Sequence, residues 1–332
     1  MHYVGVDLHK RTSWFCVLDS KGHKVKSKNV NNDTAELTQF IKNIPQPFEI
    51  AVESTYNWYF FVDLVQSYAE RIYLANSFSL KAFAKQHKKN DKIDAHLIAD
   101  VLCKGFLPKV VIADKETRQI RELLRSRLTL TADRSRNMLR LGSLIDKLGL
   151  PSGRLYPSVS NIDNHIMSEN IPVIYRAIIE DYKERIVYLT KKLYQLRKQI
   201  MGIVQKDQDM KNLETIPGIG FFSAALIKSE IMNIKRFATF KRLCAYSGLA
   251  PKTFSSANKL YYGPINKNRR KLLQWILLEN VYKFIKALPD KNEKFERIKQ
   301  AKNHNTAKVV LARDFLRIIY KILKEKRTFY YV

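Results

Sequence analysis

The chain has 332 residues, of which 45% are hydrophobic, so it can bury packed cores over two or three domains and is not a disordered chain. Its 59 lysines and arginines outnumber its 31 acidic residues, and the formal charge of +28 favours a polyanionic partner, with nucleic acid as the first candidate. A membrane surface is disfavoured because the sequence contains no run of about 18 apolar residues.

The N-terminus and the cysteines predict a cytoplasmic protein. A strand pattern starts at once with Met1-His2-Tyr3-Val4, so no signal or transit peptide is expected. Three widely separated cysteines, Cys16, Cys103 and Cys244, predict neither a disulfide framework nor a zinc site and fit a reducing compartment.

Residues 1–108 are predicted to form an α/β domain. Alternating and continuous apolar runs predict strands at 2–8, 13–18, 24–30, 49–53 and 71–75. Helices are expected at 34–43, with Asp33 as cap, at 58–67, and at 91–104, with Ile93, Leu97, Ile98, Val101 and Leu102 on its apolar side. The turn at 20–22 predicts a hairpin. Three meandering strands followed by alternating helix and strand indicate a ribonuclease-H-like order.

Residues 109–207 are predicted to be a helical linker. An arginine-rich helix is expected over 117–150, a loop over 151–164, and a second helix after it. In this second helix, apolar residues recur at alternating spacings of three and four residues, which predicts a coiled-coil seam. Its members are Ile179, Tyr182, Ile186, Leu189, Leu193, Leu196, Ile200 and Ile203. The pair would form an antiparallel hairpin or a dimer arm. The arginines are either a solvated face or a nucleic-acid surface.

Residues 208–332 are predicted to be mostly helical. The segment Ile216-Pro217-Gly218-Ile219-Gly220, followed by a helix over 222–231, is typical of a helix-hairpin-helix turn, whose amides can face a phosphate. The alternative is a Pro-Gly loop between two packing helices. A basic loop over 263–270 leads into a helix at 271–284, and the tail at 306–326 is a helix with a core-facing stripe.

Four carboxylates are the strongest candidates for a catalytic site. Asp7 and Glu53 end apolar strands, while Asp91 and Asp94 share one face at the start of a helix. Like charges brought together repel unless a cation lies between them. One Mg²⁺ ion, or two about 4 Å apart, would hold the tetrad and act on a phosphodiester. Taken singly, each acid could also be a helix cap or a surface residue.

A second candidate segment runs from Tyr246 to Lys259 and contains Ser255 and Ser256. Serines in polar loops usually have no chemical role, and a serine nucleophile needs a base or a metal to activate it. No histidine lies nearby in the sequence, so a Ser-His-Asp triad is not supported.

Taken in order, the motifs GVDLHK, VEST, KxDxxDA, IPGIG, YSGLAPK and YYGPINKNRRK resemble the DEDD insertion-sequence transposases, the "insertion sequence one-ten" family that includes the Piv DNA invertase. The resemblance spans nearly the whole chain. It implies a RuvC-like N-terminal domain, a coiled-coil linker and a C-terminal transposase domain. It also implies Mg²⁺ on Asp7, Glu53, Asp91 and Asp94, and a serine nucleophile at Ser255 that joins DNA covalently.

The resemblance further implies partners. These are element and target DNA, a structured guide RNA (the "bridge" RNA of many members), and other copies of the chain in a dimer or tetramer. Candidate nucleic-acid-binding residues, taken from the basic and glycine-rich segments, are Lys88, Lys89, Lys92, Arg121, Arg125, Gly218, Gly220, Lys259, Lys267, Arg269 and Arg270.

Two departures from the family pattern occur. Tyr56 stands where a glycine usually follows the acid-Ser-Thr triplet, and Ala257-Asn258 follow Ser256 where a glycine is usual. The second leaves Ser255 and Ser256 hard to separate, and spacing from Pro251 favours Ser255. Two other functions stay open: a RuvC-like junction-resolving nuclease that uses metal-activated water, and a non-catalytic nucleic-acid-binding protein.

Overall fold

The chain divides into two compact units, Met1–Ala113 and Asp114–Val332. The structure, a computed structural model, describes residues 1–83, 90–150, 171–256, 259–265 and 269–330, with the main chain alone at 252–256, 259–262 and 264. None of the described helices is both long and apolar enough to cross a membrane. The expected domain divisions near residues 108 and 207 remain predictions.

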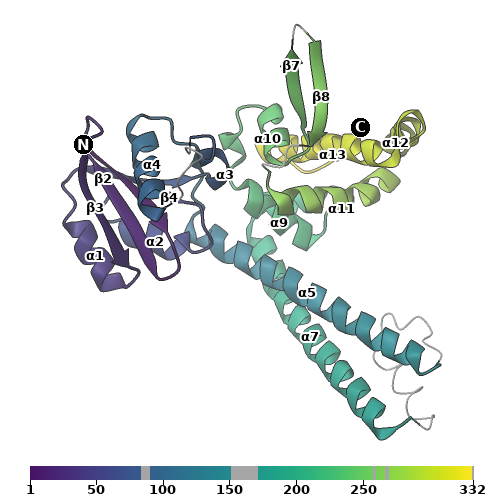
Figure 1. Ribbon diagram of the computed structural model, residues 1–332. Coiled ribbons are helices and arrows are strands. Elements are labelled where there is room, and N and C mark those ends of the chain that lie inside the picture. The colour runs from purple at the N-terminus through teal and green to yellow at the C-terminus, as the bar shows by residue number, and fades with distance from the viewer. Residues whose placement is uncertain (84–89, 151–170, 257–258, 266–268, 331–332) are drawn as a thin grey trace. The chain divides into compact units, whose positions relative to one another are not determined.

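A six-stranded mixed sheet forms the centre of the first unit, in the order β3-β2-β1-β4-β5-β6 (Figure 1). Strand β1 runs antiparallel to β2 and parallel to β4, and β4 is parallel to β5. The strands are β1 (His2–Leu8), β2 (Thr12–Leu18), β3 (Lys24–Asn31), β4 (Phe48–Glu53), β5 (Arg71–Ala75) and β6 (Lys109–Val110). The five predicted strands and the hairpin of β2 with β3 are confirmed, whereas the short β6 was not predicted.

Helices cover both faces of this sheet. They are α1 (Thr34–Lys42), α2 (Trp58–Val65), α3 (Ser77–Leu80) and α4 (Asp91–Cys103). Asp33 caps α1 as predicted, because its side chain accepts the amides of Ala35 and Glu36. Alternate strand residues point to opposite faces, so Val4, Val6 and Leu8 pack with α1 and α2, while Cys16 and Leu18 pack against α4. The expected apolar side of α4 needs one correction: Ile93 is 44% exposed, and Ala95 and Ala99 are buried instead.

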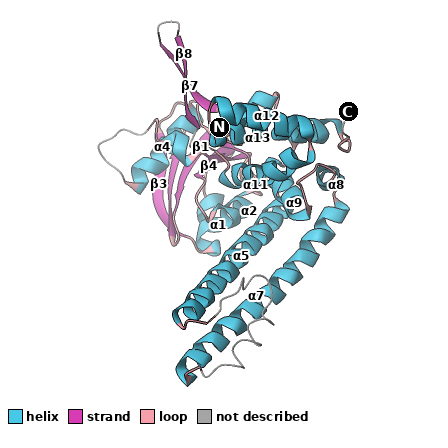
Figure 2. Cartoon of the chain, turned by 90° about the vertical axis from the view of Figure 1, so that its right-hand side faces the viewer, coloured by secondary structure: helices cyan, strands magenta, loops and turns pink. Residues whose placement is uncertain are grey.

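Two long helices open the second unit, α5 (Lys115–Lys147) and α7 (Val173–Lys206). They pack side by side and antiparallel: Leu141 and Ile145 cluster with Ile179 and Ile186. At the other end, Leu124 shares a core with Ile200 and Val204. Figure 2 shows α5 and α7 running side by side. All eight residues of the predicted seam are buried or half-buried. The hairpin alternative is therefore observed within one chain, while self-association stays a prediction. The predicted loop at 151–164 lies outside the described residues.

The rest of the second unit is a helical core with one small sheet. Its helices are α8 (Gln208–Glu214), α9 (Phe221–Ile231), η1 (Ile234–Arg236), α10 (Phe240–Tyr246), α11 (Lys271–Ala287), α12 (Pro289–Ala301) and α13 (His304–Glu325). The stripe of α13 faces the core as predicted, since Phe315, Leu316 and Ile319 are fully buried.

Strands β7 (Pro251–Ser256) and β8 (Lys259–Ile265) pair antiparallel into a two-stranded sheet. A polar loop was expected around the serines and a basic loop over 263–270. This hairpin corrects the first expectation, and the second at 263–265, whereas 269–270 are irregular as expected and 266–268 lie outside the described residues. The physical reason lies in strand-favouring residue types: Phe254 stands opposite Tyr261, and Thr253 opposite Tyr262.

Candidate metal centre and nucleic-acid interface

Asp7 and Glu53 reach the same point because they lie on neighbouring parallel strands. Val6 pairs with Val52, so the next residue on each strand is the acid at its carboxyl end. Alternation along β4 buries Ile50 and Val52 against α1 and α2 and directs Ala51 to the α4 side. Asp7 and Glu53 therefore share the face of the sheet that α4 covers.

Asp91 and Asp94 are supplied by the first turn of α4. Asn90 caps this helix by accepting the amide of Lys92. Gly5 on β1 lets the helix come close: a Cβ there would lie 2.2 Å from the carbonyl oxygen of Ala95 and 2.3 Å from the amide nitrogen of Ala99. A side chain at residue 5 would thus push away the helix that carries both acids.

His9 joins two of these carboxylates. Its Nε2 lies 3.1 Å from Oδ2 of Asp7 and 3.3 Å from Oδ2 of Asp91. One ligand atom from each of these three residues falls within 4.8 Å of the others. His9 lies in the GVDLHK motif, but no role was predicted for it. The signal that could have found it is its position two residues after a strand-end acid.

The electrostatics of the cluster centre on Asp7. This carboxyl is 5% exposed, and burial is the largest cause that raises its pKa, to about 6. Asp91, Glu53 and Asp94 raise the pKa further, and His9 opposes them. Asp91, Glu53 and Asp94 are therefore each near enough to Asp7 to disfavour its ionised form, although among the described residues only Asp7, His9 and Asp91 bring ligand atoms within 4.8 Å of one another. Carboxylate oxygens that share a site in this way are the donor set that Mg²⁺ prefers.

Ser255 lies in β7, where its main chain pairs with that of Leu260, and Ser256 pairs with Lys259. The acidic residues belong to the first unit and both serines to the second. The structure therefore brings Asp7 and Asp91 together, with Glu53 and Asp94 near enough to act on Asp7, and it places both serines on a strand of the other unit.

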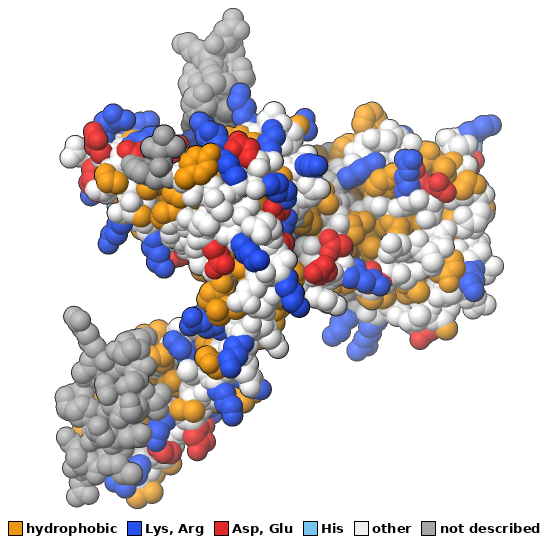
Figure 3. Space-filling model, turned by 180° about the vertical axis from the view of Figure 1, so that it is seen from behind, with side chains coloured by type: hydrophobic (Ala, Val, Ile, Leu, Met, Phe, Trp, Pro, Cys, Tyr) orange, Lys and Arg blue, Asp and Glu red, His pale blue; other side chains and the backbone are white. Residues whose placement is uncertain are grey.

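The candidate nucleic-acid residues fall into different environments. Lys92 is exposed at the start of α4, and Arg125 is half-buried, with Nη1 2.6 Å from Oε1 of Glu122. Figure 3 shows lysine and arginine side chains spread over the visible surface of both units. Lys88, Lys89 and Lys267 lie outside the described residues, and for Lys259 the structure describes the main chain in β8.

Arg121 does not suit a nucleic-acid contact in this structure. It is 6% exposed, and its Nε and Nη2 donate to the carbonyl oxygen of Ser229 at 3.1 and 2.8 Å. Burial lowers the pKa of its guanidinium. Because protein groups occupy this side chain, we leave Arg121 out of the proposed nucleic-acid surface. Arg270 similarly binds a protein carboxylate, Glu230.

The two glycines of the Pro-Gly turn between α8 and α9 differ. Gly218 has φ +93°, and a Cβ there would lie 3.0 Å from the carbonyl oxygen of Asn280 on α11, so this glycine serves helix packing. Gly220 is the residue before α9, and no described atom lies within 4 Å of where its Cβ would stand. Of the pair, Gly220 is the one that leaves room for a phosphate near the amides of a helix start.

Comparison with known proteins gives two family matches. A model of DEDD transposases of the IS110 group, described as transposase, matches residues 4–149, and a model described as "Transposase IS116/IS110/IS902 family" matches residues 210–296. The transposase for insertion sequence element IS1328 of Yersinia enterocolitica is 21% identical over 276 residues, covering 83% of this chain and 81% of the relative. The transposase for insertion sequence element IS1111A of Coxiella burnetii is 21% identical over 344 residues, covering 98% of this chain and 90% of the relative.

Proposed function

This chain belongs to the IS110 family of DEDD transposases, and from that premise we propose that it cuts and rejoins the DNA of an insertion sequence through Mg²⁺ held by its acidic cluster and a covalent bond to Ser255. The single observation that carries the proposal is the meeting of Asp7 and Asp91 around His9 at one edge of the sheet, where burial, and then Asp91, Glu53 and Asp94, raise the pKa of Asp7. A binding protein with charge +28 would have no need for such a costly acidic cluster.

The four carboxylates would hold Mg²⁺, which supplies charge neutralisation at the scissile phosphate and favours the ionised form of an attacking hydroxyl. Asp7 contributes a buried oxygen from the sheet, and Asp91 an exposed one from α4. His9 lies within hydrogen-bonding reach of both carboxylates and would fix their orientation. The buried Asp7 would thus provide the fixed side of the site, and the exposed Asp91 the side that DNA can reach.

Ser255 would act as the nucleophile. Its Oγ would lose its proton and form a bond to phosphorus, the bond from phosphorus to a deoxyribose oxygen would break, and that oxygen would take up a proton to become a free hydroxyl. The phosphoserine bond conserves the energy needed for rejoining. Ser256, the next residue of β7, is the alternative nucleophile.

The proposed partners follow from charge and from family membership. DNA of the element ends and of the target is the substrate, and a structured guide RNA would direct the choice of target. The excess of 28 positive charges suits the binding of several phosphate backbones at once. The α5–α7 hairpin would support assembly into a dimer or tetramer in a cytoplasmic, nucleoid-associated complex.

The decisive experiment is denaturing electrophoresis of the protein with labelled element-end DNA, Mg²⁺ and transcripts of the flanking non-coding region. We expect label to migrate with the protein, and to vanish with Ser255→Ala or with a chelator, while the matched variant Ser256→Ala retains it. Cleaved DNA without labelled protein would replace the proposal with hydrolysis by metal-activated water. Binding that is indifferent to chelation, with no cleavage, would favour a non-catalytic protein.

A further inference from the structure

A buried carboxylate outside the acidic cluster lies at the end of α9. Glu230 is 1% exposed, and neither the sequence motifs nor the proposed chemistry uses it. An ionised carboxylate removed from water is costly unless it is paired and hydrogen-bonded. Its partners therefore show which parts of the fold depend on it.

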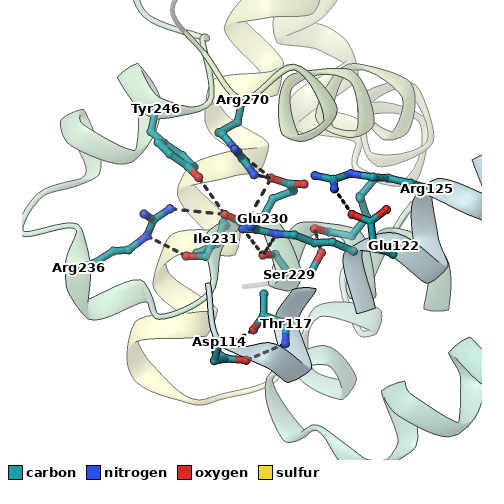
Figure 4. A network of polar contacts seen from close by, with 12 residues as sticks. Asp114, Thr117, Glu122, Arg125, Ser229, Glu230, Ile231, Arg236, Tyr246 and Arg270 are labelled. Atoms are coloured by element: carbon teal, nitrogen blue, oxygen red, sulfur yellow. Dashed lines mark hydrogen bonds and ion pairs between the residues drawn. The ribbon is translucent and has the colours of Figure 1, made fainter. Parts of the chain in front are cut away.

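The main partner of Glu230 is Arg270, the residue directly before α11. Nε and Nη2 of Arg270 lie 2.8 and 2.5 Å from Oε2 of Glu230 (Figure 4). Nη2 of Arg121 lies 4.0 Å from the same oxygen. Charge-assisted contacts of an arginine fork fix direction as well as distance. Glu230 thus determines where the chain enters α11.

Side chains from three other elements bind the last carbonyls of α9 around Glu230. Tyr246 of α10 donates its hydroxyl to the carbonyl oxygen of Glu230 at 3.1 Å, and Nε of Arg236 donates to that of Ile231 at 3.0 Å. Arg121 of α5 donates to the carbonyl oxygen of Ser229. Helix ends leave such carbonyls without intrahelical partners, so these contacts make the end of α9 a fixed point.

The chain segments that flank the β7–β8 hairpin both contact this fixed point, through Tyr246 before β7 and Arg270 after β8. On the leading side, Nε2 of Gln274 donates to the carbonyl oxygen of Gly248 at 2.7 Å, and Nε of Arg313 donates to that of Leu249 at 2.6 Å. On the trailing side, the amide of Arg270 donates to the carbonyl oxygen of Tyr246 at 3.1 Å. The two sides of the hairpin base are therefore bonded to each other and to α11 and α13.

Gly248 allows this closure. It has φ +74°, and a Cβ there would lie 2.3 Å from Cδ of Arg269. Two facts therefore require glycine at residue 248: its backbone is left-handed, and Arg269, in the chain that follows β8, lies where a side chain would stand.

We propose that Glu230 is a positioning residue for the serine: its carboxylate, through Arg270, holds the base of the β7–β8 hairpin, and thereby the strand that carries Ser255, while its main-chain carbonyl accepts the Tyr246 hydroxyl at the same place. The inference rests on the proposed function, which makes Ser255 the nucleophile. A two-stranded hairpin has little stability of its own, so its direction depends on its base. A displacement of about 1 Å at a reacting atom can cost about 100-fold in rate.

The test uses the full chain with Glu230→Gln, which keeps the shape and removes the charge, and with Glu296→Gln as matched control. Glu296 forms an exposed pair with Lys299 in the same unit. We expect Glu230→Gln to lower the single-turnover rate of adduct formation at saturating DNA by about 10- to 100-fold, with DNA affinity unchanged. Glu230→Asp, which keeps the carboxylate, should recover part of the rate, and Glu296→Gln should match the unaltered protein.

A second readout separates this inference from the proposed chemistry. Amide hydrogen exchange over 251–265 should become faster in Glu230→Gln, while exchange in α7 stays unchanged. Unchanged hairpin exchange, or an adduct rate equal to that of the control, would overturn the positioning role and leave the serine chemistry intact. If the unaltered protein forms no adduct, the proposed function fails instead, and the exchange result still shows whether Glu230 holds the hairpin. Should Glu230→Gln not fold, Arg270→Lys weakens the same contact with the charge retained.

Discussion

The acidic cluster of the first unit is built on a six-stranded sheet and the helix that covers it, whereas Ser255 of the second unit lies on a sheet of two strands. Asp7 is held by buried neighbours on both sides, since Val6 and Leu8 are at most 1% exposed. The serine strand depends on polar contacts at its base, such as that of Arg270 with Glu230. Changes near the acids should therefore alter stability and metal binding, and changes near the serine should alter mainly the geometry of attack.

The largest effect is expected from Asp7→Asn, which alters the acidic cluster on the six-stranded sheet. Removing this ligand should lower adduct formation on the order of 10³-fold, because charge stabilisation at the phosphate is lost. The same variant should melt at a higher temperature than the unaltered protein without metal, since one repelling charge is gone. Activity assays and thermal melts with and without Mg²⁺ test both effects.

The matched control for Asp7→Asn is Asp100→Asn. Asp100 lies on α4 like Asp91 and Asp94 but pairs with Lys104 at 2.8 Å. Activity of the control close to that of the unaltered protein is expected. Retention of a Mg²⁺-dependent melting shift in Asp7→Asn would argue against the metal site.

Gly5→Ala tests whether the close approach of α4 to β1 builds the cluster. The added Cβ would lie 2.2 Å from a backbone oxygen, so α4 must move, and we expect a loss of about 3 kcal/mol in unfolding free energy. Gly142→Ala on α5 is the control: no described atom lies within 4 Å of the new Cβ, and helix propensity predicts a gain of about 0.5–1 kcal/mol. Urea unfolding measures both, and an undestabilised Gly5→Ala would contradict the packing argument.

The pH dependence of stability tests the raised pKa of Asp7 in the acidic cluster. The pKa of Asp7 is raised from 3.8 to about 6, so the folded state holds this proton more tightly than the unfolded state. Its contribution is fully present below about pH 4 and is lost as the pH rises to about 6, by up to about 3 kcal/mol for the metal-free protein. Urea unfolding in a chelator from pH 4 to 7 should show this fall, and Asp7→Asn should lack it. Equal slopes for the two proteins would refute the raised pKa.

The structure around the acidic cluster was predicted from the sequence better than the β7–β8 hairpin that carries Ser255, for a physical reason. Strand alternation, the Asp33 cap and the paired acids on α4 are local signals, and each was found in place. Ile93 was misassigned because helical periodicity alone does not say how wide the contact with the sheet is.

The base of the hairpin, by contrast, depends on contacts between distant residues. Arg270 binds a carboxylate 40 positions earlier, and Arg121 binds a carbonyl 108 positions later. No periodicity encodes such pairs, so an arginine that looks like a nucleic-acid ligand in the sequence can be a buried structural residue. Local signals could have found β7 and β8 from their aromatic and β-branched residues, but the basic and polar residues around them pointed to a loop.

The smallest expected effect distinguishes an exposed basic residue, Lys92, from a buried one, Arg121. Lys92 is exposed beside the acidic cluster, so Lys92→Gln should weaken DNA binding modestly and reduce the slope of log affinity against log salt by about 1. Arg121→Lys should leave that slope unchanged but destabilise the protein by about 1–3 kcal/mol, because its two bonds to the Ser229 carbonyl cannot both be kept. Salt titrations of DNA affinity with urea unfolding measure both quantities. A reduced salt slope in Arg121→Lys, with stability retained, would return this arginine to the nucleic-acid surface and show that its buried contacts open when DNA binds.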